Sequence, residues 1–169
     1  MPLTAACRER ASGDGPGPVL EARWNGKDSA KIKGAATAEW CDSLRLLQIQ
    51  VLLGDTGVAI ALYPVRRIEA GRFRVVAPAT VDSNRPWAAV ALRWFAETSI
   101  RGFQGDSGVV VLEQPRPGVL TGTFDAKAHS VTDAVRLSIR GDFRDLIVRP
   151  ASRGCPVRRK GPDSGTGVH

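Results

Sequence analysis

The sequence predicts an all-β domain, either an antiparallel sandwich or a closed barrel of about ten short strands. No segment keeps a helical hydrophobic period over three turns, whereas alternation of apolar and polar residues recurs along the chain. The 18 glycines and 11 prolines gather between these alternating segments, where turn residues belong. Because many of the connections are short, neighbouring strands should be mostly antiparallel.

The two ends of the chain differ in composition from this domain. Residues 1–18 are predicted to be an anchor and linker, because the run Gly13-Asp14-Gly15-Pro16-Gly17-Pro18 supports neither a helix nor a strand ladder. Residues 19–149 form the all-β domain, and residues 150–169 form a basic tail rich in proline and glycine. No stretch approaches the roughly 18 apolar residues of a membrane helix.

The first half of the domain contains the clearest hairpin. Leu46–Leu53 and Val58–Tyr63 are predicted strands, joined by the turn Gly54-Asp55-Thr56-Gly57. The first expected strand, at 19–24, ends at Asn25-Gly26, which is a strong hairpin signal. The remaining expected elements are short strands at 19–24, 30–33 and 36–41 and one helical turn around 65–70.

The second half continues with short strands separated by turn residues. Gly105-Asp106-Ser107-Gly108 and Pro115-Arg116-Pro117-Gly118 are predicted turns. The expected strands are 72–76, 88–95, 100–104, 109–113, 119–128, 135–140 and 142–148. In the second-last of these, Leu137 and Ile139 should share one face.

Charge is unevenly distributed along the chain. The net charge is +7, of which +4 lies in residues 149–169. The tail cations Arg153, Arg158, Arg159 and Lys160 are therefore candidate contacts with an anionic membrane surface or an acidic partner. A solvated tail that keeps the protein soluble is the alternative. Nucleic acid is not an expected partner, because no aromatic residues are interleaved with these cations.

The sequence shows no recognisable catalytic, cofactor or metal site. Gly105-Asp106-Ser107-Gly108 contains the nucleophile motif of chymotrypsin-like proteases, but no histidine precedes Ser107, and His129 falls on a predicted turn. No phosphate-binding loop or dinucleotide motif is present. The cysteines lack metal-binding spacing, and the only histidines are His129 and His169. We therefore expect a protein that is not an enzyme and that has no cofactor.

Aromatic residues supply the candidate contact positions. Alternation places Leu92 and Trp94 on one face of a strand and Arg93 and Phe95 on the other. Phe95 is therefore predicted to contact a partner, and Trp87, which follows Arg85-Pro86, is a second candidate contact residue. The alternative places Trp94 in the core and Phe95 beneath a loop.

Two features of the sequence resemble those of a known protein family. Leu3-Thr4-Ala5-Ala6-Cys7 is similar to the lipobox of bacterial lipoproteins, and it precedes a charged linker rich in glycine and proline. The segments 103–111, 120–126 and 139–143 resemble the hairpin motifs of uncharacterised bacterial envelope lipoproteins with β-sandwich or barrel bodies. This resemblance implies a lipid on Cys7 and a location at the periplasmic face of the cell envelope.

The three cysteines fit that resemblance. In an oxidising envelope compartment, a lipidated Cys7 leaves Cys41 and Cys155 to form a disulfide. Three unrelated thiols in a cytosolic protein are the alternative.

Together these features predict a non-catalytic, lipid-anchored envelope protein that acts as a binding or assembly module. It would associate with a membrane surface and with other protein subunits, as in an accessory subunit of a photosynthetic or respiratory complex. A lipocalin-like carrier of a small hydrophobic ligand is the alternative, although Arg23-Trp24-Asn25-Gly26 matches the lipocalin G-x-W motif poorly.

Overall fold

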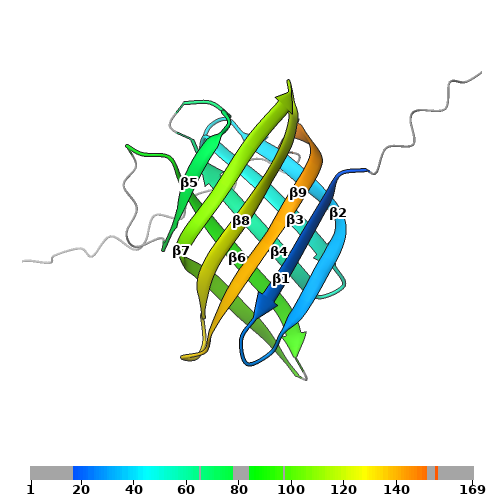
Figure 1. Ribbon diagram of the computed structural model, residues 1–169, viewed down its shortest axis with the longest axis vertical. Helices are drawn as coiled ribbons and strands as arrows, with labels where there is room; N and C mark the ends of the chain where they lie inside the picture. Colours follow the sequence, from blue (N-terminus) through cyan, green and yellow to red (C-terminus); the bar gives the residue numbers. More distant parts are fainter. Residues whose placement is uncertain (1–16, 65, 78–83, 97, 152–154, 156–169) are drawn as a thin grey trace, which may run out of the picture.

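A computed structural model describes residues 17–64, 66–77, 84–96, 98–151 and 155. This part of the chain forms nine strands and no helix, which confirms the predicted all-β class (Figure 1). The strands are β1 (Val19–Asn25), β2 (Ala30–Cys41), β3 (Leu46–Leu53), β4 (Thr56–Tyr63), β5 (Gly71–Val76), β6 (Trp87–Ala96), β7 (Ser99–Arg116), β8 (Val119–Ser130) and β9 (Arg136–Pro150).

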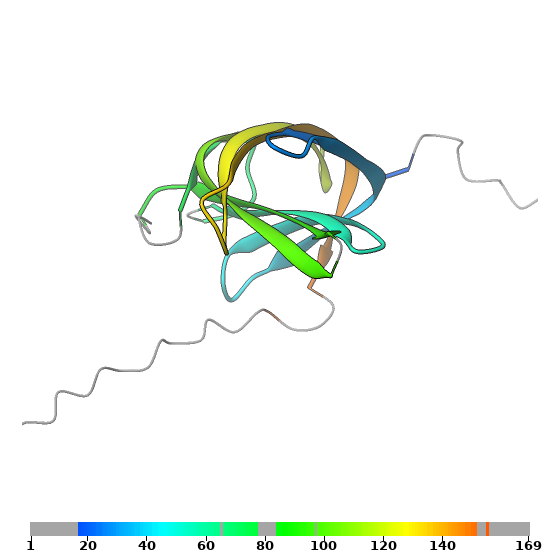
Figure 2. The same cartoon turned by 90° about the horizontal axis from the view of Figure 1, so that it is seen from below.

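The nine strands close into a barrel, which resolves the expected choice between a sandwich and a barrel. The order around the barrel is β1-β2-β3-β4-β6-β5-β7-β8-β9, and the antiparallel β1–β9 pair closes it. Strand β5 is inserted between β6 and β7 over part of their length, and elsewhere β6 and β7 pair directly. Seen along the barrel, the side containing β3, β4 and β6 is flatter, and the side containing β8, β9 and β1 arches over it (Figure 2).

The barrel has two distinct ends. The β1–β2, β3–β4, β6–β7 and β8–β9 connections lie together at one end, which we call the hairpin end (Figure 1). The opposite end, which we call the tail end, contains the beginning of β1 and the end of β2. Val19 pairs there with Ala35, and Cys41 lies further along β2 in the same direction. The two ends matter below because they carry different side chains.

Several strands are longer than the sequence predicted. The expected strands 30–33 and 36–41 form one strand, β2, and 135–140 and 142–148 form one strand, β9. Gly34 does not interrupt β2, because the side chains of Val51 and Leu53 lie against its backbone and occupy the space of the missing side chain. No helical turn forms over residues 66–70, and Val65 lies outside the described residues.

The predicted turn at Gly105–Gly108 is wrong, because this segment is a β-bulge inside β7. Gly105 pairs with Ala128 and Ser107 pairs with Lys127, so Asp106 is an extra residue between them. Gly108 has a φ of 136°, and a Cβ there would lie 2.1 Å from the carbonyl oxygen of Asp125. A glycine and an extra residue therefore bend this long strand without ending it.

Side chains fill the barrel interior as one hydrophobic cluster. Leu137 and Ile139 both belong to it, as their predicted common face requires. Two glycine–phenylalanine pairs face each other across β8 and β9: Gly122 lies opposite Phe143, and Phe124 lies opposite Gly141. Both rings are buried, and each lies over the glycine of its pair, where any side chain would collide with it. The repeated Gly-x-Phe spacing at 122–124 and 141–143 therefore serves core packing.

Cys41 and Cys155 form a disulfide with a Cα–Cα distance of 5.3 Å, in agreement with the expected pairing. The bond joins residues 114 positions apart. It attaches Cys155 to the end of β2, at the tail end of the barrel.

Candidate functional site

The outer wall formed by β2, β3, β4, β6 and β7 presents a continuous row of small and neutral residues. Each member lies directly opposite the next across a strand pair. The row consists of Thr37, Gln50, Ala59, Ala91 and Gln104. The next row toward the hairpin end contains Leu52, Gly57, Arg93 and Gly102.

The opposite side of the barrel has a different outer wall. There a row across β2, β1, β9 and β8 consists of Lys31, Arg23, Arg140 and Asp125. The neighbouring row includes Glu21, whose carboxylate lies 3.1 Å from the ammonium of Lys33. This contact and the nearby charge of Lys33 hold the pKa of Glu21 below its usual value. The barrel is therefore charged on one side and largely uncharged on the other.

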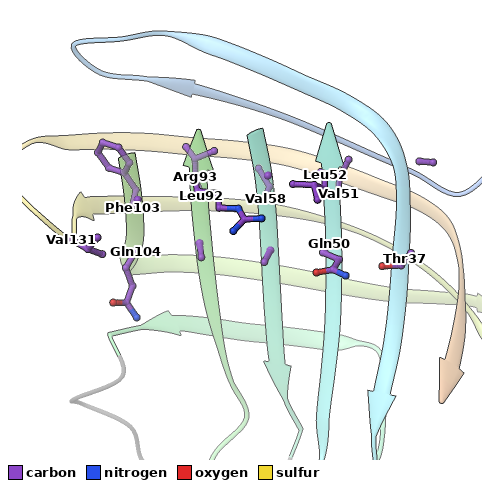
Figure 3. Close-up of a pocket in the computed structure, with 15 residues that line it drawn as sticks. Thr37, Gln50, Val51, Leu52, Val58, Leu92, Arg93, Phe103, Gln104 and Val131 are labelled. Carbon is purple, nitrogen blue, oxygen red and sulfur yellow. The ribbon is translucent and has the colours of Figure 1, made fainter. Parts of the chain in front are cut away.

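The two rows on the wall formed by β2, β3, β4, β6 and β7 line a groove of about 660 Å³ on the outside of the barrel (Figure 3). Its floor is formed by the methyl groups of Ala59 and Ala91 and by backbone. Arg93 is the only ionisable side chain among the described residues that line the groove. A Cβ at Gly57 would lie 3.7 Å from Nε of Arg93 and 3.1 Å from Leu52, so the absence of a side chain there leaves room for both.

A second feature is a rim of exposed apolar residues at the hairpin end. Among the described residues, six large apolar side chains are exposed, and five of them lie at this end. These five are Leu52, Leu53, Phe95, Ile100 and Val131. Phe95 and Ile100 are direct cross-strand neighbours and are 51% and 62% exposed. The sixth, Ile147, lies on β9 toward the tail end and gives a matched comparison.

Aromatic rings close the barrel interior beneath this rim. Trp94 stacks on Trp24 with ring centroids 5.6 Å apart and on Phe103 with centroids 4.9 Å apart. Above them lies a hollow of about 340 Å³ at the mouth of the barrel, lined by Trp24, Trp94, Leu53 and Phe95 and also by the charged residues Asp28, Lys31 and Lys33. The exposed rim therefore rests on an aromatic layer. Trp94 packs against the core, as one sequence alternative expected, but Phe95 is exposed and not beneath a loop as that alternative required.

The bulge in β7 brings Asp106 to His129. Nδ1 of His129 lies 2.5 Å from the Asp106 carboxylate, whose other oxygen lies 3.4 Å from Arg136. His129 was expected on a turn, but it lies within β8. Ser107 pairs with Lys127, and it is Asp106 that His129 contacts. The cluster ties β7, β8 and β9 together at the bulge. The sequence alone does not indicate this cluster, because Gly105-Asp106-Ser107-Gly108 has the composition of a turn and its bulge depends on pairing with β8.

The turn between β8 and β9 is ordered by its own polar groups. The Ser130 hydroxyl accepts hydrogen bonds from the backbone N–H groups of Thr132 and Asp133, and the Asp133 carboxylate accepts one from the N–H of Val135. Hydrogen bonding from the Ser130 side chain and then from Val135 holds the pKa of Asp133 below its usual value. The turn therefore presents Val131, part of the apolar rim, in a defined position.

The predicted contact residues do not form one patch. Phe95 is exposed on the rim, whereas Trp87 lies at the other end of β6, half-buried and stacked on Tyr63 with ring centroids 3.9 Å apart. The predicted lipidation site Cys7 lies outside the described residues, as do the tail cations Arg153, Arg158, Arg159 and Lys160.

No described group of His, Cys, Asp and Glu side chains could hold a metal ion. The described residues contain no helix that is long and apolar enough to span a membrane. Comparison with protein-family models, with curated proteins and with solved structures finds no match to this chain.

Proposed function

We propose that the protein is a non-catalytic binding and assembly module of the bacterial cell envelope, attached to the periplasmic face of a membrane by a lipid on Cys7. The observation that carries this proposal is the concentration of exposed apolar side chains at the hairpin end of the barrel. Exposed apolar clusters on a folded domain are typical of protein–protein contact sites. We assign the rim around Phe95 and Ile100 as the surface that contacts another protein subunit.

The positions of the two termini support this arrangement. β1 begins at the tail end, so the linker from Cys7 would join the barrel there. The disulfide between Cys41 and Cys155 brings the basic tail to the same end. A lipid and a cluster of cations both favour a membrane surface with anionic lipids. The tail end would then face the membrane, and the rim would point toward a partner.

The carrier alternative needs a ligand inside the barrel, and the core packing opposes it. Phe143, Leu20, Leu47, Ile49 and Ile60 are among the interior side chains with no exposed surface. They belong to the hydrophobic cluster that fills the barrel. The hollows described above lie on the outer wall and at the mouth.

The rim is tested by co-purification from native membranes in mild detergent, followed by mass spectrometry. The wild-type protein should carry an acyl group on Cys7 and should co-purify with stoichiometric partner subunits. Phe95→Ser together with Ile100→Ser should remove the partners, whereas the control Ile147→Ser should retain them. Partners that remain with the rim variant would refute this docking surface, and an unmodified Cys7 would refute the anchor.

The tail is tested separately in the same preparation. Charge reversal at Arg158, Arg159 and Lys160 should weaken membrane association at low salt, because cation–headgroup attraction is screened by ions. Unchanged association would remove the tail from the proposal and leave the rim intact.

A further inference from the structure

We infer that the outer groove binds a long-chain monocarboxylate, with its carboxylate on Arg93 and its hydrocarbon chain over Ala59 and Ala91. The groove shares Leu52 and Val131 with the rim, but its centre at Ala59 and Ala91 is separate from the proposed partner contact at Phe95 and Ile100. The inference rests on the shape of the groove, its single charge and its length.

The shape comes from residues that are smaller than their neighbours. Two alanines lie opposite each other at the centre of the groove, and glycines occupy positions 57 and 102 on either side of Arg93. A Cβ at Gly102 would lie 3.2 Å from Val131, so the Val131 side chain packs over this glycine at one side of the groove. The volume of about 660 Å³ is within the range of small-molecule sites.

The charge of the lining specifies the head group. Arg93 forms no ion pair among the described residues, and its neighbours in the same row, Gly57 and Gly102, have no side chains. Arg93 is exposed along the groove, and its planar guanidinium can bind a carboxylate through two parallel hydrogen bonds. The amides of Gln50 and Gln104 offer further donors from the adjacent row. One cation and neutral amides favour a ligand with a single negative charge.

The length of the groove specifies the chain. The lining residues extend over five strands, from Ala35 and Thr37 on β2 to Gln104 on β7. Adjacent strands are about 4.8 Å apart, so Arg93 on β6 lies roughly 14 Å from the β2 side. A hydrocarbon chain that extends from the guanidinium toward β2 would pass over Ala59 on β4 and then over Leu52 on β3. A short carboxylate would leave this apolar floor uncovered, so affinity should rise with chain length.

Calorimetric titration of the purified full chain with dodecanoate, below its micelle concentration, tests the site. We expect saturable binding of one molecule, weaker binding of octanoate and none of acetate. Dodecanol should bind at least about tenfold more weakly, because it lacks the charge-assisted hydrogen bonds. Dodecyltrimethylammonium should not bind. Equal binding of dodecanoate and the cationic amphiphile would overturn the inference.

Variants locate the site. Arg93→Gln should weaken dodecanoate binding at least about tenfold. The matched control Arg140→Gln, on the charged outer wall, should not change it. Ala59→Leu should fill the floor of the groove and abolish dodecanoate binding. If that variant does not fold, Arg93→Gln alone tests the site. Wild-type affinity in Arg93→Gln would refute the site, as would binding to phosphatidylglycerol vesicles without binding of free dodecanoate. Because no partner is present in this assay, its outcome is independent of the rim.

Discussion

The Phe–Gly pairs of β8 and β9 give a sharp test of how the barrel closes. Gly141 lies in β9 opposite Ala22 of β1, where the sheet closes on itself. A Cβ at Gly141 would lie 2.1 Å from the carbonyl oxygen of Glu21, 2.8 Å from the Phe124 ring and 2.9 Å from Cα of Ala22. Since two of these atoms are backbone, a side chain there requires β1 to move away from β9.

Gly141→Ala should therefore be strongly destabilising. Inserting one carbon into a packed core typically costs about 1–3 kcal/mol, and a backbone collision places this variant near the upper value. For a domain of this size, each kcal/mol lowers Tm by about 2–4 °C, so we expect a decrease of roughly 6–12 °C. Thermal unfolding measures the decrease of Tm, and urea unfolding under non-reducing conditions, followed by tryptophan fluorescence, measures the change in unfolding free energy.

The matched control is Gly71→Ala. Gly71 is exposed at the start of β5, and no atom lies within 4 Å of the position of its Cβ. That substitution should be neutral, or stabilising by about 0.4–1 kcal/mol through the unfolded state. A Gly141→Ala variant whose unfolding free energy stays within about 0.5 kcal/mol of the wild type would refute the close packing of β1 against β9.

Two further predictions concern the tail and the β8–β9 turn. Replacing Cys41 by serine, or reducing the wild-type disulfide, should lower the free energy of unfolding by up to about 4–5 kcal/mol, because the bond closes a long loop; reductant that leaves urea unfolding unchanged would contradict this. The pKa of Asp133 is lower in the folded protein than in the unfolded chain, where it is near 3.8. The ionised carboxylate should therefore stabilise the fold at pH values above 3.8, and this contribution should be lost as the pH falls through the lower pKa of the folded state. Asp133→Asn should remove that part of the acid dependence in unfolding measurements between about pH 2 and 6, and an unchanged pH profile would argue against it.

The sequence was sufficient for elements whose signal is local. The hairpin from Leu46 to Tyr63 is present as predicted, because alternation and a Gly-Asp-Thr-Gly turn act within one short segment. Breaks were predicted wrongly where a glycine serves packing between strands. Gly34 and Gly105 lie against Leu53 and Val75, and these contacts join residues distant in the chain.

The candidate site was less predictable for the same reason. Phe95 could be identified as an outward-facing residue, because alternation within β6 places it on the other face of the strand from Trp94. The groove could not be predicted, since Gln50, Ala91 and Gln104 become neighbours only through the register of three strand pairs. A short turn fixes the register of the β3–β4 hairpin, but no short turn joins β4 to β6, so their register has no local signal.

The alanines of the groove floor suggest a final test that links stability to binding. Alanine is depleted in strands, because its methyl group covers little of the neighbouring side chains. Ala91 is exposed on the outer wall of β6, so nothing in the core requires a residue this small. If the position is small because a ligand fills the space, Ala91→Val should stabilise the free protein by up to about 1 kcal/mol, the span of strand propensities.

The same variant should lose most of its affinity for dodecanoate, because the added methyl groups occupy the floor of the groove. The control Ala30→Val places the same change at an exposed position of β2 that does not line the groove, and its binding should match the wild type. Urea unfolding and calorimetric titration on the same preparations measure both effects. A gain in stability with unchanged binding would mean that the alanine is merely tolerated, whereas opposite changes would show that the outer wall is less stable than it could be because a ligand occupies it.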